Sequence, residues 1–293
     1  MKKNIILLLL ISFFIFSCGN DDFKQQSKLG ELRVLALSIN DSTTKRPEIN
    51  SGSSLAVEIT PLVSYVDGAG VILNYTWEAC PDPGIDFGAD INCDSSISSF
   101  KQTGTGTLDT SGLLDTAGGV VSFYTGFATA ITLNVPTVVF SSYVASLNST
   151  IQFNGVNYLF IIKYTDPSNG NKITALKKIK LSSKAIGDLN TNPSFADILF
   201  NGSPLGSYPT AEGKLLLNTA SAAQSYTQIT NVGTKTFSED MFISWYSTSG
   251  EYLFNRTDVG EENTFTPEGT SGVFVAVYRD SRGGIFSIVR SSP

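Results

Sequence analysis

The sequence contains no histidine among its 293 residues. Without an imidazole, the chain cannot form the Ser-His-Asp or Cys-His pairs that activate nucleophiles, or the histidine-based zinc sites of hydrolases. A carboxylate pair or a Ser-Lys arrangement remains open, for example in a glycoside hydrolase with two acids across a cleft. We therefore expect no catalytic residues, no cofactor and no enzymatic activity. The only acidic candidates, chosen by residue type because no motif links any two of them, are Glu58, Glu78, Glu239 and Asp240.

Positive charge is also scarce. The chain has 20 Lys and Arg residues against 26 Asp and Glu residues, which gives a formal net charge of -6. An acidic protein gains no affinity from displacing the counterions of a phosphate backbone. Nucleic acid is therefore not an expected partner.

The sequence has no apolar run of the roughly 20 residues that a membrane-spanning helix needs. An apolar run at the start, Ile5 to Phe16, covers twelve positions, is interrupted only by Ser12, and follows the basic residues Lys2 and Lys3. A basic end, a short apolar segment and a small residue at the cleavage site are typical of a secretory signal. Here the small residue is Ser17.

The segment Ile15-Phe16-Ser17-Cys18 resembles the lipobox of bacterial lipoproteins. The resemblance implies that the chain is cut before Cys18, that the sulfur of this cysteine is diacylated, and that its new amine is acylated as well. A single acyl chain gives only marginal membrane binding, whereas the three chains of this family hold a protein firmly. The alternative is a plain secretory signal cut nearby, which would leave a free thiol at Cys18.

The residues after Cys18 bear on where the protein is located. Gly19 is not the Asp that retains lipoproteins in the inner membrane of enteric bacteria, so the family rule points to the outer membrane. Asp21 and Asp22 resemble the short acidic signals that carry some lipoproteins to the cell surface. The resemblance therefore predicts a protein that a lipid anchors to the outer membrane, on its periplasmic face or at the cell surface.

Cysteine is rare, with three residues in all. If lipid occupies Cys18, then Cys80 and Cys93 remain, in a compartment that permits disulfides. Two thiols without histidine cannot complete the usual four-ligand zinc site. We therefore expect a disulfide between Cys80 and Cys93, and no metal site.

The loop between these two cysteines is acidic, which leaves calcium binding as a minor alternative. Carboxylate oxygens are ligands that calcium prefers, but the spacing here does not match an EF-hand. Solvated acidic loops are also ordinary in an acidic protein. The residues concerned are Asp82, Asp86 and Asp90, with Asp94 just outside the loop.

Alternating apolar and polar residues predict β-strands along most of the chain. The 19 Phe and 11 Tyr residues favour strands as well. In the stretch Val156–Tyr164, one face collects Tyr158, Phe160, Ile162 and Tyr164. The stretch Asp94–Gly119 is rich in Ser, Thr and Gly and has little alternation, so it is predicted to be a long loop. The spacing of apolar residues from Phe140 to Leu147 predicts one short helix.

The strand pattern begins again after a polar stretch with turn residues, which indicates a boundary between two domains. Each half places one tryptophan within a central strand, Trp77 and Trp245, and Gly155-Val156-Asn157-Tyr158 is similar to a tyrosine corner. These features resemble immunoglobulin-like domains, although neither half has the cysteine pair that bridges the two sheets of that family. The resemblance implies an all-β fold of two tandem immunoglobulin-like β-sandwich domains. The predicted organisation is a signal peptide (1–17), a lipidated cysteine and flexible tether (18–31), a first sandwich with a long loop (32–182), a linker (183–194) and a second sandwich (195–293).

A candidate binding surface follows if Trp245 points inward in the second domain. Alternation then suggests an inner face for Val273, Val275, Val277, Ile285 and Val289. The opposite face would gather five aromatic side chains that could stack on sugar rings or receive a protein partner. The alternatives are that this face packs against the first domain or the long loop, or that the strand registers differ. The five residues are Phe242, Tyr246, Phe274, Tyr278 and Phe286.

Two short motifs, Trp77-Glu78-Ala79-Cys80 and Arg279-Asp280-Ser281-Arg282-Gly283-Gly284, also resemble two-domain envelope lipoproteins without an assigned role. The second motif is equally well explained as the turn of a hairpin. Taken together, the sequence favours a non-enzymatic envelope lipoprotein that binds a protein or glycan partner. A structural subunit of an envelope assembly is the second hypothesis, and a carboxylate-dependent glycoside hydrolase is a distant third. Fold class does not decide among them, because sandwiches host all three roles.

Overall fold

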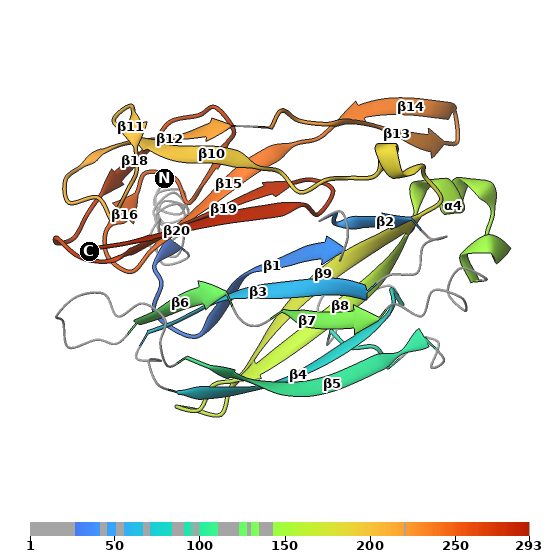
Figure 1. Ribbon diagram of the computed structural model, residues 1–293, viewed down its shortest axis with the longest axis horizontal. Coiled ribbons are helices and arrows are strands. Elements are labelled where there is room, and N and C mark those ends of the chain that lie inside the picture. Colours follow the sequence, from blue (N-terminus) through green and yellow to red (C-terminus); the bar gives the residue numbers. More distant parts are fainter. Residues whose placement is uncertain are drawn as a thin grey trace, which may run out of the picture.

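The computed structural model describes residues 27–41, 46–50, 56–66, 71–83, 91–94, 96, 100–110, 123–127, 130–134, 143–219 and 221–292 (Figure 1). These residues form almost only β-strands, arranged in several sheets that pack on one another. The predicted all-β fold is confirmed. The division into two domains stays a prediction, so we refer to residues 27–182 as the first half and residues 195–292 as the second half.

The first half contains two facing sheets. One sheet has the order β1 (Arg33–Asp41), β3 (Ala56–Val66), β6 (Phe123–Phe127), and β7 (Ile131–Asn134) pairs with β3 as well. The other has the order β2 (Glu48–Asn50), β9 (Lys172–Ser182), β8 (Val156–Thr165), β4 (Ile72–Pro81), β5 (Gln102–Asp109). Among the pairings between the strands that the structure describes, only β2 with β9 is parallel, and the single bridge between Lys28 and Ser247 is parallel as well. Between β7 and β8, residues 143–146 are helical, as predicted, and a further short helix, α4 (Ser149–Asn154), follows.

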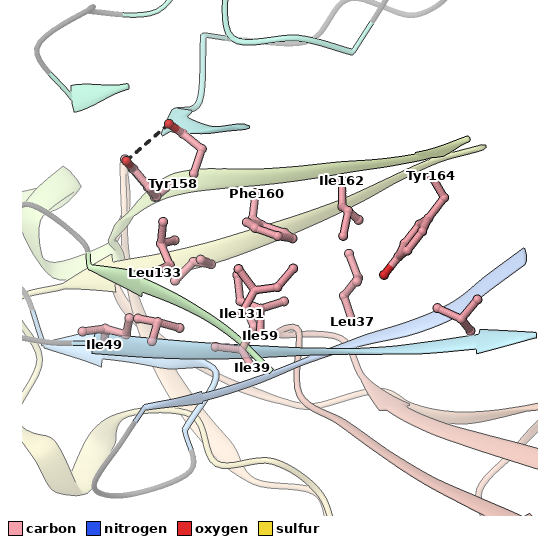
Figure 2. Close-up of a cluster of buried hydrophobic side chains, with 14 of the residues drawn as sticks. Leu37, Ile39, Ile49, Ile59, Ile131, Leu133, Tyr158, Phe160, Ile162 and Tyr164 are labelled. Atoms are coloured by element: carbon pink, nitrogen blue, oxygen red, sulfur yellow. Dashed lines mark hydrogen bonds between the residues drawn. The ribbon is translucent and has the colours of Figure 1, made fainter. Parts of the chain in front are cut away.

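The core of the first half lies between these two sheets. Figure 2 shows the side chains of β8 pointing toward Leu37, Ile39 and Ile59 on the opposite sheet. The predicted shared face of β8 is confirmed, and each of its four side chains is fully buried. Burial of one large apolar side chain stabilises the fold by about 1.5–3 kcal/mol, so this face is a major source of stability. The four residues are Tyr158, Phe160, Ile162 and Tyr164.

The predicted long loop contains a strand that the sequence pattern missed. Within it, β5 pairs with β4 along its whole length. Gly104 and Gly106 stand opposite Trp77 and Tyr75, and a Cβ on Gly104 would lie 2.6 Å from the Trp77 ring. The aromatic rings of β4 therefore cover the face of β5 where apolar side chains would otherwise give the strand its alternating signature.

The second half has two further sheets. One has the order β11 (Ser203–Pro204), β10 (Phe195–Phe200), β12 (Gly213–Thr219), β18 (Asn263–Thr266), β16 (Glu251–Tyr252). The other has the order β17 (Arg256–Asp258), β15 (Met241–Ser247), β19 (Val273–Asp280), β20 (Ile285–Ser291). A core between them contains the fully buried Trp245, as expected. A two-stranded hairpin, β13 (Ser225–Thr230) and β14 (Gly233–Ser238), lies with α4 at one end of the long axis, away from β16 and β18 (Figure 1).

A third cluster of buried residues joins the two halves. It combines residues of the first half (Leu29, Leu35, Ala36 and Leu62) with residues of β19 and β20 (Val273, Val275, Val277 and Ile285). The sheet containing β19 therefore has apolar contacts on both faces. The two halves bury apolar surface against each other and do not rest on a polar contact alone.

The segments that were predicted to be a flexible tether and a linker both take part in this packing. The end of the predicted tether runs along the second half, where Leu29 donates from its N–H to the Ser247 carbonyl at 2.7 Å and is buried. In the predicted linker, Lys184, Leu189 and Asn190 are buried. The described part of each segment is thus tied down by apolar contacts and backbone hydrogen bonds, which polar composition alone does not reveal.

Candidate functional site

The predicted disulfide is present between Cys80 and Cys93, whose Cα atoms lie 5.9 Å apart. Both residues are fully buried and pack with Leu159 and Ile161 on the outer face of β8. The disulfide therefore joins the described segment 91–94 to the end of β4 on this face of the sheet. The other cysteine of interest, Cys18, lies outside the described residues.

The acidic loop and the carboxylate candidates lie in separate settings. Asp82 pairs with Lys178 at 3.1 Å and Asp94 with Lys101 at 3.3 Å, whereas Asp86 and Asp90 lie outside the described residues. No group of three or more potential metal ligands comes together within the described residues. Among the carboxylate candidates, Glu58 and Asp240 are exposed, Glu78 pairs with Lys101 and Lys163, and Glu239 is buried against Arg282.

The prediction that five aromatic side chains share one exposed face is wrong. Trp245 pairs with Ala276, and Ile243 with Tyr278, so the inward face of β19 carries Phe274 and Tyr278, both fully buried. Phe286 lies opposite Tyr278 and packs on the same core.

The other two aromatic residues lie on the opposite face of the same sheet. Tyr246 packs on the cluster that joins the halves, and the Arg256 guanidinium lies 3.4 Å from the centre of the Phe242 ring. The valines that alternation had placed inward belong to this face. The error arises because both faces of β19 are apolar, and a shift of one residue in register exchanges them.

A cluster of buried charges lies instead at the turn between β19 and β20. The Arg282 guanidinium bonds Glu48 from the first half through one nitrogen, and Glu239 through the other at 3.1 Å. Lys184 lies 3.4 Å from the other oxygen of Glu48. Removing one partner of such a buried pair costs about 3–5 kcal/mol, because the remaining charge is left without compensation.

The carboxylates of this cluster have opposite pKa shifts. Burial alone would raise the pKa of Glu48, but the Asn190 N–H, Lys184, the Ser182 hydroxyl and Arg282 together hold it below its usual value. Burial raises the pKa of Glu239, and the nearby Asp280 charge raises it further, although a Gln224 N–H and Arg282 oppose the shift. Glu48 therefore keeps its negative charge to a lower pH than Glu239 does.

The turn that presents Arg282 is fixed by its own backbone. One oxygen of the Asp280 carboxylate accepts from the N–H groups of Arg282 at 2.8 Å and Gly284 at 2.7 Å. The other oxygen accepts from the Asn190 amide at 3.1 Å. A Cβ on Gly284 would lie 2.1 Å from this second oxygen, so only glycine fits there. The motif that sequence analysis could explain as a simple hairpin turn thus holds a buried contact between the two halves.

Above this cluster is a cleft of about 430 Å³, which we call the Arg282 cleft. Arg282 is one of its lining residues, and the Arg282 guanidinium lies 4.7 Å from the centre of the Tyr226 ring on the hairpin. Gln224 bonds Thr191 through its side chain and Glu239 through its backbone N–H at 3.0 Å. The lining residues are Gly187, Asp188, Leu189, Thr191, Gln224, Ser225, Tyr226, Thr227, Thr236 and Arg282.

The hairpin that forms one wall of the cleft is held in place by α4. Asn154 donates from its amide to the Ile229 carbonyl at 2.7 Å and accepts from the Ile229 N–H at 2.9 Å. An isolated two-stranded hairpin is marginally stable in water, so this double hydrogen bond matters for its position. Every residue of β14 is exposed, so its sequence has no alternating pattern, and sequence analysis missed this strand and with it the cleft.

No protein-family model matches this chain, and a search of curated proteins finds no similar sequence. None of the helices in the described part of the chain has the length and apolar character needed to cross a bilayer.

Proposed function

We propose that this protein is a non-enzymatic lipoprotein, anchored to the outer membrane by lipid on Cys18, that binds an envelope protein or glycan in the Arg282 cleft. The observation that carries the proposal is the position of the cleft relative to the N-terminal segment. Lys28 pairs with Ser247 at one end of β15, whereas Met241 at the other end pairs with Asp280 beside the cleft.

This arrangement suits a protein that is held at one end and binds at the other. The eight residues of β19 span about 24 Å between the two ends. Nine residue steps separate Cys18 from Ser27, and an extended chain of that length reaches about 30 Å. A lipid on Cys18 would keep the Ser247 end within about 30 Å of the bilayer, whereas the cleft, about 24 Å further along the molecule, could lie well beyond that distance.

The lipid anchor is tested by metabolic labelling with an alkyne analogue of palmitate in cells that produce the full chain. We expect label on the wild-type protein, none on a Cys18→Ser variant, and full label on a Cys80→Ser, Cys93→Ser variant as a matched control. The wild-type protein should sediment with the outer membrane. Equal label on wild type and Cys18→Ser, or an unlabelled protein in the cytosol, would remove the anchor from the proposal.

The cleft is tested by photo-crosslinking in the same cells. We place p-benzoyl-phenylalanine at Thr236, which lines the cleft, or at the exposed Leu253, which does not. We expect a discrete adduct, with protein or glycan, from position 236 alone. If the two positions give the same adducts or none, the cleft is not the binding site.

A further inference from the structure

We infer that the ligand of the Arg282 cleft is an uncharged saccharide. This inference rests on the proposed function and names the class of ligand. It follows from the charges, the hydrogen-bonding groups and the aromatic rings that the structure places around the cleft.

The charge of the cleft does not favour an anion. Arg282 is the only cation among the described residues that line it, and two buried carboxylates, Glu48 and Glu239, already neutralise it. Its side chain is only 5% exposed, so an incoming anion would have to displace a buried ion pair. The exposed Asp188 adds a negative charge to the lining. A carboxylate or phosphate ligand would therefore meet repulsion without an unpaired cation in return.

The charge does not favour a cation either. Asp188 is exposed to water, where a single ion pair contributes at most about 1 kcal/mol. The remaining polar groups of the lining are uncharged and include hydroxyls, which both donate and accept hydrogen bonds. Sugar hydroxyl groups have the same dual character. The uncharged polar residues are Thr191, Gln224, Ser225, Thr227 and Thr236.

The hairpin contributes one aromatic side chain to the lining, that of Tyr226. Tyr226 and Phe237 lie opposite each other on β13 and β14, and their rings stack with centroids 5.7 Å apart. Phe237 does not line the cleft, but it supports the Tyr226 ring and is itself 37% exposed. Aromatic rings of this kind pack against the C–H face of a pyranose ring, which carries no charge. The volume of about 430 Å³ falls within the range of about 300–1,000 Å³ that is typical of small-molecule sites.

The inference is tested by calorimetric titration of the full lipidated chain in detergent. The probes are neutral disaccharides (maltose, cellobiose and chitobiose), and each is compared with a uronate or sulfated counterpart. We expect binding of at least one neutral disaccharide, with little dependence on salt, because no charge pair forms. The charged counterpart should bind about tenfold more weakly or not at all.

Two variants assign the binding to the cleft. Tyr226→Ala removes the ring, and Asp188→Ala removes an exposed carboxylate whose loss does not threaten the fold. Tyr226→Ala should weaken binding by about tenfold, and Asp188→Ala, which removes an exposed hydrogen-bond acceptor, by about threefold. Phe254→Ala, which removes an exposed aromatic side chain outside the cleft, should leave binding unchanged.

Three outcomes would overturn the inference. They are preference for the charged sugar, equal loss in all three variants, and no sugar binding while position 236 still crosslinks to a protein. The last outcome would leave the proposed function standing with a protein as the partner. Absence of both sugar binding and crosslinks would remove the cleft from the proposed function as well.

Discussion

At the scale of single residues, Lys177 shows how burial changes the pKa of a charged side chain. It lies on the same face of β9 as Ile179, is 8% exposed, and donates from its ammonium to the Gly283 carbonyl of the second half. Burial lowers the pKa of Lys177 to about 8, partly opposed by the Asp280 charge and reinforced by Arg279. The folded protein therefore loses this proton more readily than the unfolded chain does.

This shift predicts that stability depends on pH between 7 and 9. A lysine with a lowered pKa in the folded state binds fewer protons than in the unfolded state, so the free energy of unfolding rises with pH. With a pKa of about 8 in the folded protein and about 10.5 in the unfolded chain, the rise from pH 7 to pH 9 is about 1 kcal/mol. Urea unfolding should show this rise in the wild type, relative to a Lys177→Met variant.

Lys178→Met is the matched control, because Lys178 is the exposed neighbour that pairs with Asp82. Its pH dependence should follow that of the wild type. If the Lys177→Met protein shows the same pH dependence as the wild type, Lys177 does not titrate in this range.

Some residue-level predictions are confirmed because they depend on local alternation alone. The shared face of β8 and the burial of Trp245 are of this kind. Others needed information from distant residues. The Tyr158 hydroxyl donates to the Phe100 carbonyl, 58 residues earlier, whereas a tyrosine corner bonds to backbone a few residues upstream. The likeness to that motif therefore does not extend to its hydrogen bond.

At the scale of elements, the disulfide fastens the segment around Cys93 to the outer face of β8. The cysteines are 13 positions apart, and closing a loop of this length stabilises the folded state by about 2–3 kcal/mol in the loop-entropy account. A Cys80→Ala, Cys93→Ala variant should unfold with a free energy lower by about this amount in urea. A reducing agent should destabilise the wild type and leave the variant unchanged. A loss below about 0.5 kcal/mol would show that the loop is held by its packing on Leu159 and Ile161.

The elements that sequence analysis missed share a physical reason. β5 has glycines where a strand usually has apolar side chains, and every residue of β14 is exposed, so neither gives an alternating pattern. Such strands form because the neighbouring strand supplies the backbone hydrogen bonds and the side chains that cover them. The faces of β19 were assigned wrongly for the complementary reason, since apolar residues on both faces leave the register undetermined.

At the scale of the whole molecule, the two halves have separate cores but are joined by several contacts, of which three connect residues that are far apart in the sequence. The N-terminal segment pairs with Ser247 at the end of β15, the apolar cluster around Leu35 and Val275 spans both halves, and Arg282 bonds Glu48 across them. The alternating pattern of the sequence indicated the two runs of strands. It could not indicate these connections, because each depends on residues that are more than 200 positions apart in the sequence.

Because these connections hold the two halves together, the N-terminal segment lies at one end of β15 and the Arg282 cleft lies near the other end. The most direct test of the account reconstitutes the lipidated protein in vesicles that contain an acceptor dye on the lipid headgroup. A donor dye is attached either to Thr270→Cys, in the loop next to the N-terminal segment, or to Val232→Cys, at the exposed tip of the hairpin. The account predicts stronger energy transfer to the membrane from position 270 than from position 232. Equal transfer from both positions, or stronger transfer from position 232, would contradict it.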